Sequence, residues 1–177
     1  MSVRPWRLVA AITIQLLILA AVPGRKLLAH VSGQEVTLQA RPVDPYDPFS
    51  GYFVNVAYEI ERTKWADGEP PPAGTEVFMT LVPTEPGWTA VGMTRTPLPP
   101  ESGRVSMKVV WDGYPHLRDA GRIYVAEDQR TEVANGLRDG SNTPLVDLKV
   151  GPDGTPAPLR IRIGGKSWGA WTGAARQ

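Results

Sequence analysis

The chain of 177 residues contains no cysteine and only two histidines, and its formal net charge is just +1. The absence of cysteine excludes disulfides, thiolate zinc sites, iron–sulfur clusters and a cysteine nucleophile, although it leaves the redox compartment open. The near-neutral charge argues against nucleic acid as a partner, because such proteins present a basic face to the phosphates. Two histidines alone do not form a metal site, and no glycine-rich strand-to-helix loop is present to cradle a phosphate. We therefore expect no cofactor and no metal.

One long uncharged segment occupies residues 8–23 and includes only two polar side chains. As a helix it would rise about 24 Å, short of the roughly 30 Å hydrocarbon core of a bilayer. Flanking basic side chains can reach the bilayer surface, and two further leucines lengthen the apolar stretch. We expect a single transmembrane span from Leu8 to about Leu28, within a membrane anchor formed by residues 1–28. A cleaved signal peptide and a soluble helix are the alternatives.

Basic residues lie on both sides of this segment. Arg4 and Arg7 precede it together with the α-amino group, while Arg25 and Lys26 follow it. Because positive charge is retained on the cytoplasmic side of a span, this slight excess predicts a cytoplasmic N-terminus. The rest of the chain would then lie outside the cytoplasm.

The remaining sequence is typical of short strands joined by turns, since 18 glycines and 18 prolines are spread between apolar runs. The close spacing of three of these runs predicts an antiparallel meander. Alternating apolar side chains predict strands at residues 35–41, 51–61, 75–83, 88–96, 103–111 and 122–127, and on both sides of a hairpin turn at 151–154.

Residues 127–140 carry the one helical pattern outside the N-terminal segment, with Asp128 as the cap and with Val133 and Leu137 four residues apart on one face. The expected fold class is mainly β, with antiparallel strands, one short helix and an N-terminal transmembrane helix. We expect the β domain over residues 30–166 and a mobile tail over residues 167–177.

The segment 42–60 is dense with Asp-Pro turn steps and then enters a regular strand. It resembles the GDYXXLXY family of membrane-anchored bacterial proteins, although Tyr52 stands where the signature has Asp. Residues 121–140 and 144–165 are similar to later segments of that family. The residues that match the lead-in and signature are Pro42, Asp44, Pro45, Asp47, Gly51, Val56 (for Leu) and Tyr58.

The resemblance implies a single-pass protein of the bacterial inner membrane or an equivalent membrane, without an assigned reaction and with a membrane-protein partner. It carries over no catalytic residue. The motif itself indicates structure: Asp44 and Asp47 suit turns, and Gly51 suits a positive φ or a close approach. On the core face, Tyr58 would bury its ring and find a partner for its hydroxyl.

A few residues could form catalytic arrangements, but each also has a simpler role. His116 could form a Ser-His-Asp arrangement with Asp112 or Asp119 and Ser102 or Ser106, but no nucleophile elbow is present and a surface-turn histidine is favoured. His30 is expected to be a hydrated residue at the membrane interface. Glu59 and Glu61 could act as an acid–base pair, but ordinary solvent-facing charges on an antiparallel strand are favoured. A Ser50–Lys64 pair is the remaining nucleophile candidate.

The chain has six tryptophans, some of which are candidates for contact with a ligand or a partner. Trp65, Trp88 and Trp111 stand at strand ends or in loops, where sugar-stacking side chains and ordinary rim packing both occur. Trp168 and Trp171, three residues apart in a Gly- and Ala-rich segment, could contact a partner protein or the bilayer interface.

These observations predict a non-enzymatic, single-pass membrane protein with an extracytoplasmic β domain, acting as an accessory or assembly subunit of a membrane complex. The alternative is a cell-envelope protein that binds a glycan or a small ligand. A membrane-anchored hydrolase is the third possibility.

Overall fold

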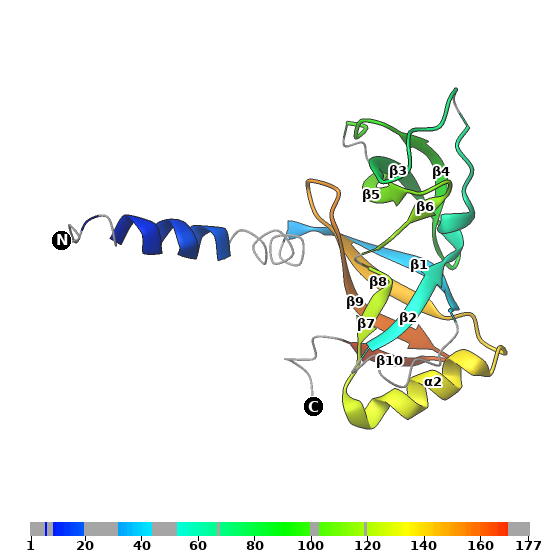
Figure 1. Ribbon diagram of the computed structural model, residues 1–177. Helices are drawn as coiled ribbons and strands as arrows, with labels where there is room; N and C mark the ends of the chain where they lie inside the picture. The colour runs from blue at the N-terminus through cyan, green and yellow to red at the C-terminus, as the bar shows by residue number, and fades with distance from the viewer. Residues whose placement is uncertain are drawn as a thin grey trace.

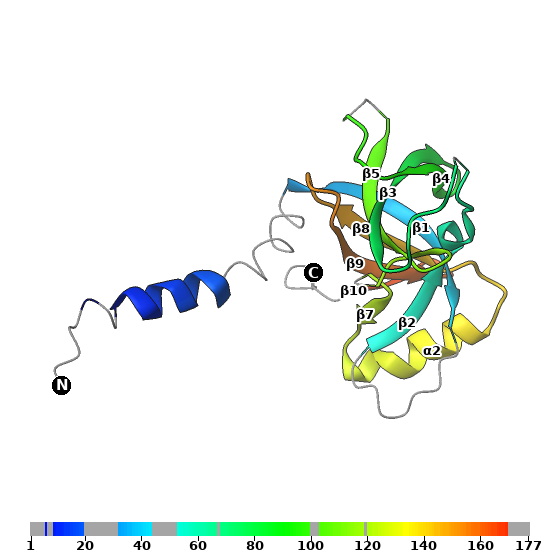
Figure 2. The same cartoon turned by 45° about the horizontal axis from the view of Figure 1, so that its top comes forward.

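A computed structural model describes Trp6 and residues 9–19, 32–43, 53–66, 68–99, 103–118 and 120–169. Within these residues the domain is built from two antiparallel sheets and one α-helix, so the predicted mainly-β class is confirmed. Figures 1 and 2 show the smaller sheet at one end of the larger sheet and the helix α2 at the other.

The larger sheet has six strands in the order β10-β9-β8-β1-β2-β7. The predicted hairpin around residues 151–154 joins β8 to β9, and Gly154 takes a left-handed conformation there with φ +84°. The strands are β1 (Gln34–Pro42), β2 (Phe53–Tyr58), β7 (Arg122–Tyr124), β8 (Leu145–Val150), β9 (Pro156–Ile163) and β10 (Lys166–Gly169).

β1 changes partner along its length. Residues 34–39 pair with β8, whereas residues 40–42 pair with β2. Among the described strands, the other edge of β1 is therefore unpaired over residues 34–39. The tip of the smaller sheet approaches β1 at this edge.

The smaller sheet has four strands in the order β4-β3-β5-β6. β3 pairs with both β4 and β5, so the sequential meander expected for these strands is wrong in its order. β4 and β5 therefore flank β3 on opposite sides. The strands are β3 (Thr75–Thr84), β4 (Gly87–Thr94), β5 (Val105–Trp111) and β6 (Pro115–His116).

The two sheets and the helix enclose one hydrophobic cluster. Val36, Leu38 and Ala40 of β1 are buried in it, as their alternation predicts. The predicted helix is also confirmed: η2 (Glu127–Gln129) leads into α2 (Arg130–Arg138), whose Val133 and Leu137 are buried. Asp128 is not the cap. That position is taken by Gln129, without a side-chain cap bond, because a 3₁₀ turn precedes the helix.

The last described strand corrects the expected tail. Residues 167–169 belong to β10, which pairs with β9 and places Trp168 opposite Ile161. The turn at Gly164 and Gly165, both with positive φ, reverses the chain so that the Trp168 indole enters the core. Residues 170–177, including Trp171, lie outside the described part of the chain.

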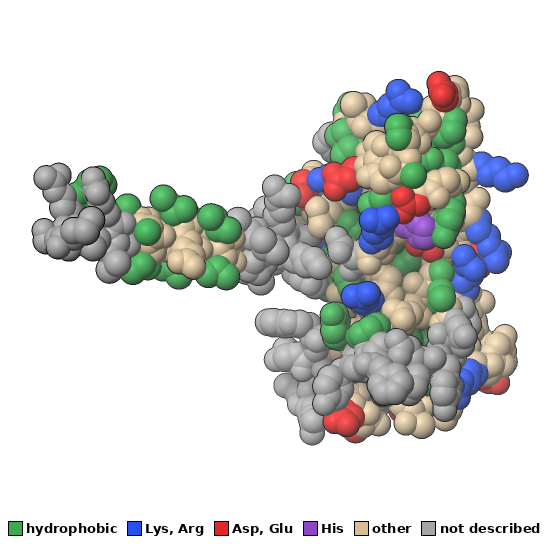
Figure 3. Space-filling view, in the orientation of Figure 1, with side chains coloured by type: hydrophobic (Ala, Val, Ile, Leu, Met, Phe, Trp, Pro, Cys, Tyr) green, Lys and Arg blue, Asp and Glu red, His purple; other side chains and the backbone are tan. Residues whose placement is uncertain are grey.

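Residues 9–19 form a helix that stands apart from the β domain (Figure 1). Its large apolar side chains are 49–65% exposed, and Figure 3 shows them on its visible sides. Over the residues that are described, no helix has the length and apolar character required to cross a membrane. The expected span to Leu28 continues beyond this helix into residues that are not described.

Candidate binding sites

Two residues of the sequence motif, Val56 and Tyr58, lie buried in β2. The Tyr58 hydroxyl donates a hydrogen bond of 2.6 Å to the carbonyl of Ala120, so the expected burial of the ring and pairing of the hydroxyl are confirmed. Pro42 lies opposite Val56 in the β1–β2 pairing. The remaining motif residues, Asp44, Pro45, Asp47 and Gly51, lie outside the described residues.

The carboxylate of Glu61 joins the end of β2 to the turn that holds Ala120. It accepts hydrogen bonds from the backbone N–H groups of Tyr58, at 3.0 Å, and Leu117, at 2.9 Å. Burial, together with the nearby Glu61 carboxylate, raises the pKa of Tyr58 far above its usual range. The phenol therefore stays neutral at physiological pH and acts as a structural donor, not as a base.

The prediction that a strand continues through Glu59 and Glu61 with both side chains facing solvent is wrong. β2 ends at Tyr58, and the 3₁₀ turn η1 (Glu59–Arg62) follows. This turn directs Glu61 inward, where it is 9% exposed, and leaves Glu59 outside in an ion pair of 2.9 Å with Arg62. The two carboxylates thus serve separate partners and do not form an acid–base pair.

The residues around His116 do not form a triad within the described chain. The His116 ring packs on Tyr114, with ring centroids 4.0 Å apart. Asp112 is bound to Arg118 and to the backbone N–H of Gly74, and the Arg118 hydrogen bond lowers its pKa despite partial desolvation. His116 lies opposite Val110 in the β5–β6 pairing. Ser106 is four residues farther along β5, about 13 Å away.

Other catalytic candidates gain no partner from the described structure. Lys64 is exposed, while Ser50, Ser102, Asp119 and His30 lie outside the described residues. No three His, Cys, Asp or Glu side chains in the described ranges are grouped to hold a metal ion.

The tryptophans separate into core residues and one pocket residue. Trp111 and Trp168 are 6% and 7% exposed, so their indole rings pack in the core and present little surface to a partner. Trp65 packs edge-to-face on Trp111, with centroids 5.7 Å apart. Trp88 is half-buried; it packs against the core and also lines a pocket.

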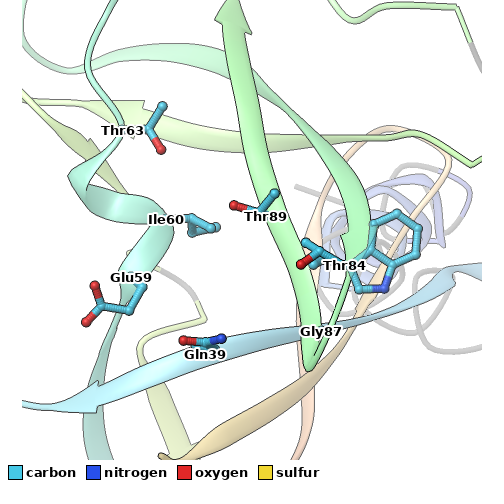
Figure 4. A pocket seen from close by; sticks show the side chains of 8 residues that line it. Gln39, Glu59, Ile60, Thr63, Thr84, Gly87 and Thr89 are labelled. Atoms are coloured by element: carbon cyan, nitrogen blue, oxygen red, sulfur yellow. The ribbon is translucent and has the colours of Figure 1, made fainter.

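This pocket, named here the β1–β4 pocket, has a volume of about 180 Å³ (Figure 4). It lies where the unpaired edge of β1 meets the start of β4 and the turn η1. Figure 4 shows Ile60 and Thr89 pointing toward one another across it, with Gln39 on β1 nearby. The lining residues are Gln39, Glu59, Ile60, Thr63, Thr84, Gly87, Trp88 and Thr89.

Gly87 fixes the position of the β3–β4 hairpin beside β1. A Cβ atom at this position would lie 2.6 Å from the carbonyl oxygen of Thr37. Only glycine permits this approach, because real Cβ atoms do not come so close to a backbone oxygen. The shape of the β1–β4 pocket thus depends on the close approach of its lining residue Gly87 to Thr37.

A second hollow, named here the turn pocket, has a volume of about 320 Å³. It lies between the start of β1, the β4–β5 connection and the β8–β9 turn, at the end of the domain where the N-terminal segment arrives (Figure 1). Its lining is largely apolar and includes Leu98, which is 40% exposed, and Val105. The buried Ser106 hydroxyl has no hydrogen-bond partner among the described residues.

Comparison with known protein families gives one match. The model of the family described as GDYXXLXY protein matches residues 15–161, which is most of the chain. The chain belongs to the GDYXXLXY family. A comparison with curated proteins found no significant match, and a comparison with solved structures found none.

This GDYXXLXY protein also has a charged network, which no sequence pattern predicts, on the face of the larger sheet opposite the core. Asp147 of β8 is 1% exposed there. Its carboxylate accepts hydrogen bonds from Thr37 at 2.7 Å, Arg160 at 2.6 Å and Arg162 at 2.8 Å. Burial alone would raise the pKa of Asp147, but these three donors outweigh it and hold the pKa below its usual range.

This network of the GDYXXLXY protein joins three strands, because Arg160 also pairs with Glu35 of β1 at 2.9 Å. Both carboxylate oxygens of Asp147 accept hydrogen bonds from neighbouring strands. The network therefore stabilises the sheet and is not an open binding site.

Proposed function

We propose that this chain is a non-enzymatic, single-pass membrane protein that serves as an accessory or assembly subunit of a membrane complex. The N-terminal helix is the observation that supports the proposal. Its Leu16, Leu17, Ile18 and Leu19 are 61–65% exposed, and they are successive residues, so they cover every side of the helix. A helix that is apolar all round is stable in lipid and unfavourable in water.

The proposed anchor comprises residues 1–28, and the proposed address is the inner membrane of a bacterium or an equivalent membrane. The slight excess of positive charge before the apolar segment supports a cytoplasmic N-terminus and an extracytoplasmic β domain. The turn pocket would then lie near the bilayer. Its largely apolar lining suits a membrane-protein partner that approaches from that side.

Membrane attachment and orientation are tested with single engineered cysteines. The natural chain contains no cysteine, so no other thiol reacts with the label. We expect an impermeant maleimide to label Glu76→Cys in intact spheroplasts and to label Ser2→Cys only after lysis. Glu76 is suitable because it is exposed in the β domain. Protection of Glu76→Cys before lysis would contradict the orientation. Extraction of the protein by alkaline carbonate, or an intact mass reduced by loss of the first residues, would contradict the retained anchor.

The partner is tested by co-purification from mild detergent through a C-terminal tag, followed by mass spectrometry. We expect a membrane protein in constant ratio, and we expect Leu98→Glu in the turn pocket to release it. Val91→Ala, on an exposed position of β4 outside that pocket, should retain it. Recovery of the protein alone, as a monomer, would contradict the proposed subunit function.

Ligand binding in the cell envelope is a second candidate function. One observation favours it: the half-buried Trp88 and several polar side chains line the same β1–β4 pocket. Small-molecule sites combine an apolar wall with a few placed polar groups in this way.

A further inference from the structure

We infer that the N-terminal helix pairs with the same helix of a second copy of this chain, through the amide of Gln15. This pairing rests on the proposed membrane anchor, and it identifies the surface through which two anchored copies assemble. Two observations carry it: the contrast between the two polar side chains of the helix, Thr13 and Gln15, and the position of Gln15 in the apolar segment.

The two polar side chains of the helix differ in their hydrogen bonding. The Thr13 hydroxyl donates a hydrogen bond of 2.9 Å to the carbonyl of Val9, one turn earlier in the same helix. The exposed Gln15 amide makes no hydrogen bond to any part of the described chain. A primary amide carries two N–H donors and an oxygen acceptor. Thr13 is therefore satisfied within its own helix, whereas Gln15 needs a partner from outside it.

Gln15 lies at the middle of the uncharged segment 8–23. As a helix, this segment places about 10 Å or more of apolar chain on either side of it. In a bilayer this position is inside the hydrocarbon, where no water is present to bond an amide. A glutamine is also too short to reach the bilayer surface as a lysine or an arginine does. An unpaired amide is unfavourable at this depth, and a hydrogen bond to another helix removes the penalty.

Gln15 also determines which side of the helix makes the contact. Large apolar side chains surround the rest of the described helix, and lipid tails solvate them as well as another helix does. The helix stands apart from the β domain, so the described part of that domain leaves its sides uncovered (Figure 1). Ala11 and Ile18 lie on the same side as Gln15, one turn before and one turn after it. This spacing is that of a coiled-coil seam, and the small Ala11 side chain permits a close approach.

A second copy of the helix supplies the matching group. An amide both donates and accepts, so two Gln15 side chains related by a two-fold axis can bond each other. Copies of one chain have the same orientation in the membrane, which places both amides at the same depth. Gln15 carries no charge, so its pairing brings no repulsion to the contact. A single polar side chain in an apolar seam also fixes the register of the two helices.

The contact is tested by disulfide cross-linking of the full chain in native membranes, where the chain itself adds no other thiol. We expect oxidation with copper phenanthroline to link two copies of Ile18→Cys, on the Gln15 side of the helix. Leu17→Cys is the matched control, because residue 17 lies about 1.5 Å from residue 18 in depth but about 100° away around the helix. Equal cross-linking at the two positions would indicate random collision and would overturn the pairing.

Variants assign the contact to the amide. Copies labelled at Glu76→Cys are reconstituted in vesicles, and energy transfer between them is followed as lipid is added. Gln15→Leu should raise the dissociation constant of the dimer about tenfold, and it makes the helix more apolar, so insertion is preserved. Gln15→Asn, which keeps an amide, should retain most of the affinity. Thr13→Val, which removes a hydroxyl already bonded within its own helix, should leave it unchanged. An unchanged dissociation constant in Gln15→Leu would overturn the assignment.

Failure of the pairing is distinguishable from failure of the proposed function. If alkaline carbonate extracts the unchanged protein, the anchor and the pairing fall together. If the protein stays in the membrane and Ile18→Cys forms no dimer, the pairing alone is overturned. If Gln15→Leu then also releases the co-purified membrane protein, Gln15 contacts a helix of that partner, and the subunit function remains. A dimer that depends on the amide in a retained anchor supports the pairing, whatever else co-purifies.

Discussion

The phenol hydroxyl of Tyr58 on β2 donates a 2.6 Å hydrogen bond to the carbonyl of Ala120, 62 residues later in the chain. Both ends of this bond are buried, and Glu61 reinforces it from η1 by holding the same turn. The final tyrosine of the sequence signature thus connects two distant segments of the domain.

Replacement of Tyr58 by Phe should lower the free energy of unfolding by about 1–2 kcal/mol, because the Ala120 carbonyl is left buried without its donor. Chemical denaturation of the full chain in detergent, followed by tryptophan fluorescence, measures the change. Tyr114→Phe is the matched control, since Tyr114 is 51% exposed and should change stability little. Equal stability of both variants would show that the hydroxyl contributes nothing.

The same tyrosine should make the protein sensitive to alkali. Burial and the Glu61 carboxylate raise the pKa of Tyr58 above the ordinary value of 10.0. Above pH 10 the unfolded chain loses this proton while the folded chain keeps it, so stability falls as pH rises. Denaturation curves between pH 9 and about pH 11 should show the advantage over Tyr58→Phe shrinking. A constant difference across this range would contradict the prediction.

Glu61→Gln should destabilise the domain by about 2–3 kcal/mol. The carboxylate accepts one backbone N–H at each oxygen, whereas an amide would turn its own NH₂ group toward one of them. Thermal unfolding measures the loss. Glu76→Gln is the control, because Glu76 is exposed on β3. Similar melting temperatures for the two variants would assign Glu61 no structural role.

Asp147→Asn should cost about 1–3 kcal/mol at neutral pH, a range reduced because the two arginine partners are 40–47% exposed. The pKa of Asp147 is depressed in the folded state, so its contribution is present above the unfolded pKa of about 3.9 and lost as pH falls. Denaturation from pH 7 to about pH 2.5 should therefore show the two proteins converging. A difference in stability that persists in acid would show that the substitution acts through packing and not through the charge of Asp147.

Gly87→Ala should destabilise the β3–β4 hairpin by about 1–3 kcal/mol, because the new methyl group would meet the Thr37 carbonyl oxygen. Gly92→Ala, on the same strand with open space around it, should be nearly neutral. Hydrogen exchange at Thr89 and Ala90 locates the effect. Faster exchange in both variants alike would indicate general strand weakening and not a steric contact.

Local periodicity accounts for the parts of this fold that the sequence predicts well. The alternation of Val36, Leu38 and Ala40 and the spacing of Val133 and Leu137 depend only on neighbouring residues. Both patterns reappear in the structure as buried faces.

The features that the sequence does not reveal depend on which distant segments meet. The sequence around Trp168 has no strand pattern of its own and therefore predicts a tail. These residues form a strand because they pair with β9. Asp147 sits on the polar face of its strand and would be taken as solvated. It is buried because Arg160 and Arg162, on the neighbouring strand, close over it. The β1–β4 pocket likewise combines residues from β1, η1, β3 and β4, and no local pattern encodes that these four elements are adjacent.

The partner change along β1 has a mechanical consequence. β1 is the first strand after the N-terminal segment, and its first six residues, 34–39, pair with β8 along their length. Tension applied through the N-terminus runs along this strand and loads those hydrogen bonds together in shear, instead of peeling them one by one. A single-molecule pull from the N-terminus should therefore meet higher resistance than a pull from the C-terminal edge strand β10. The domain should therefore resist unfolding when force is applied at its N-terminal end.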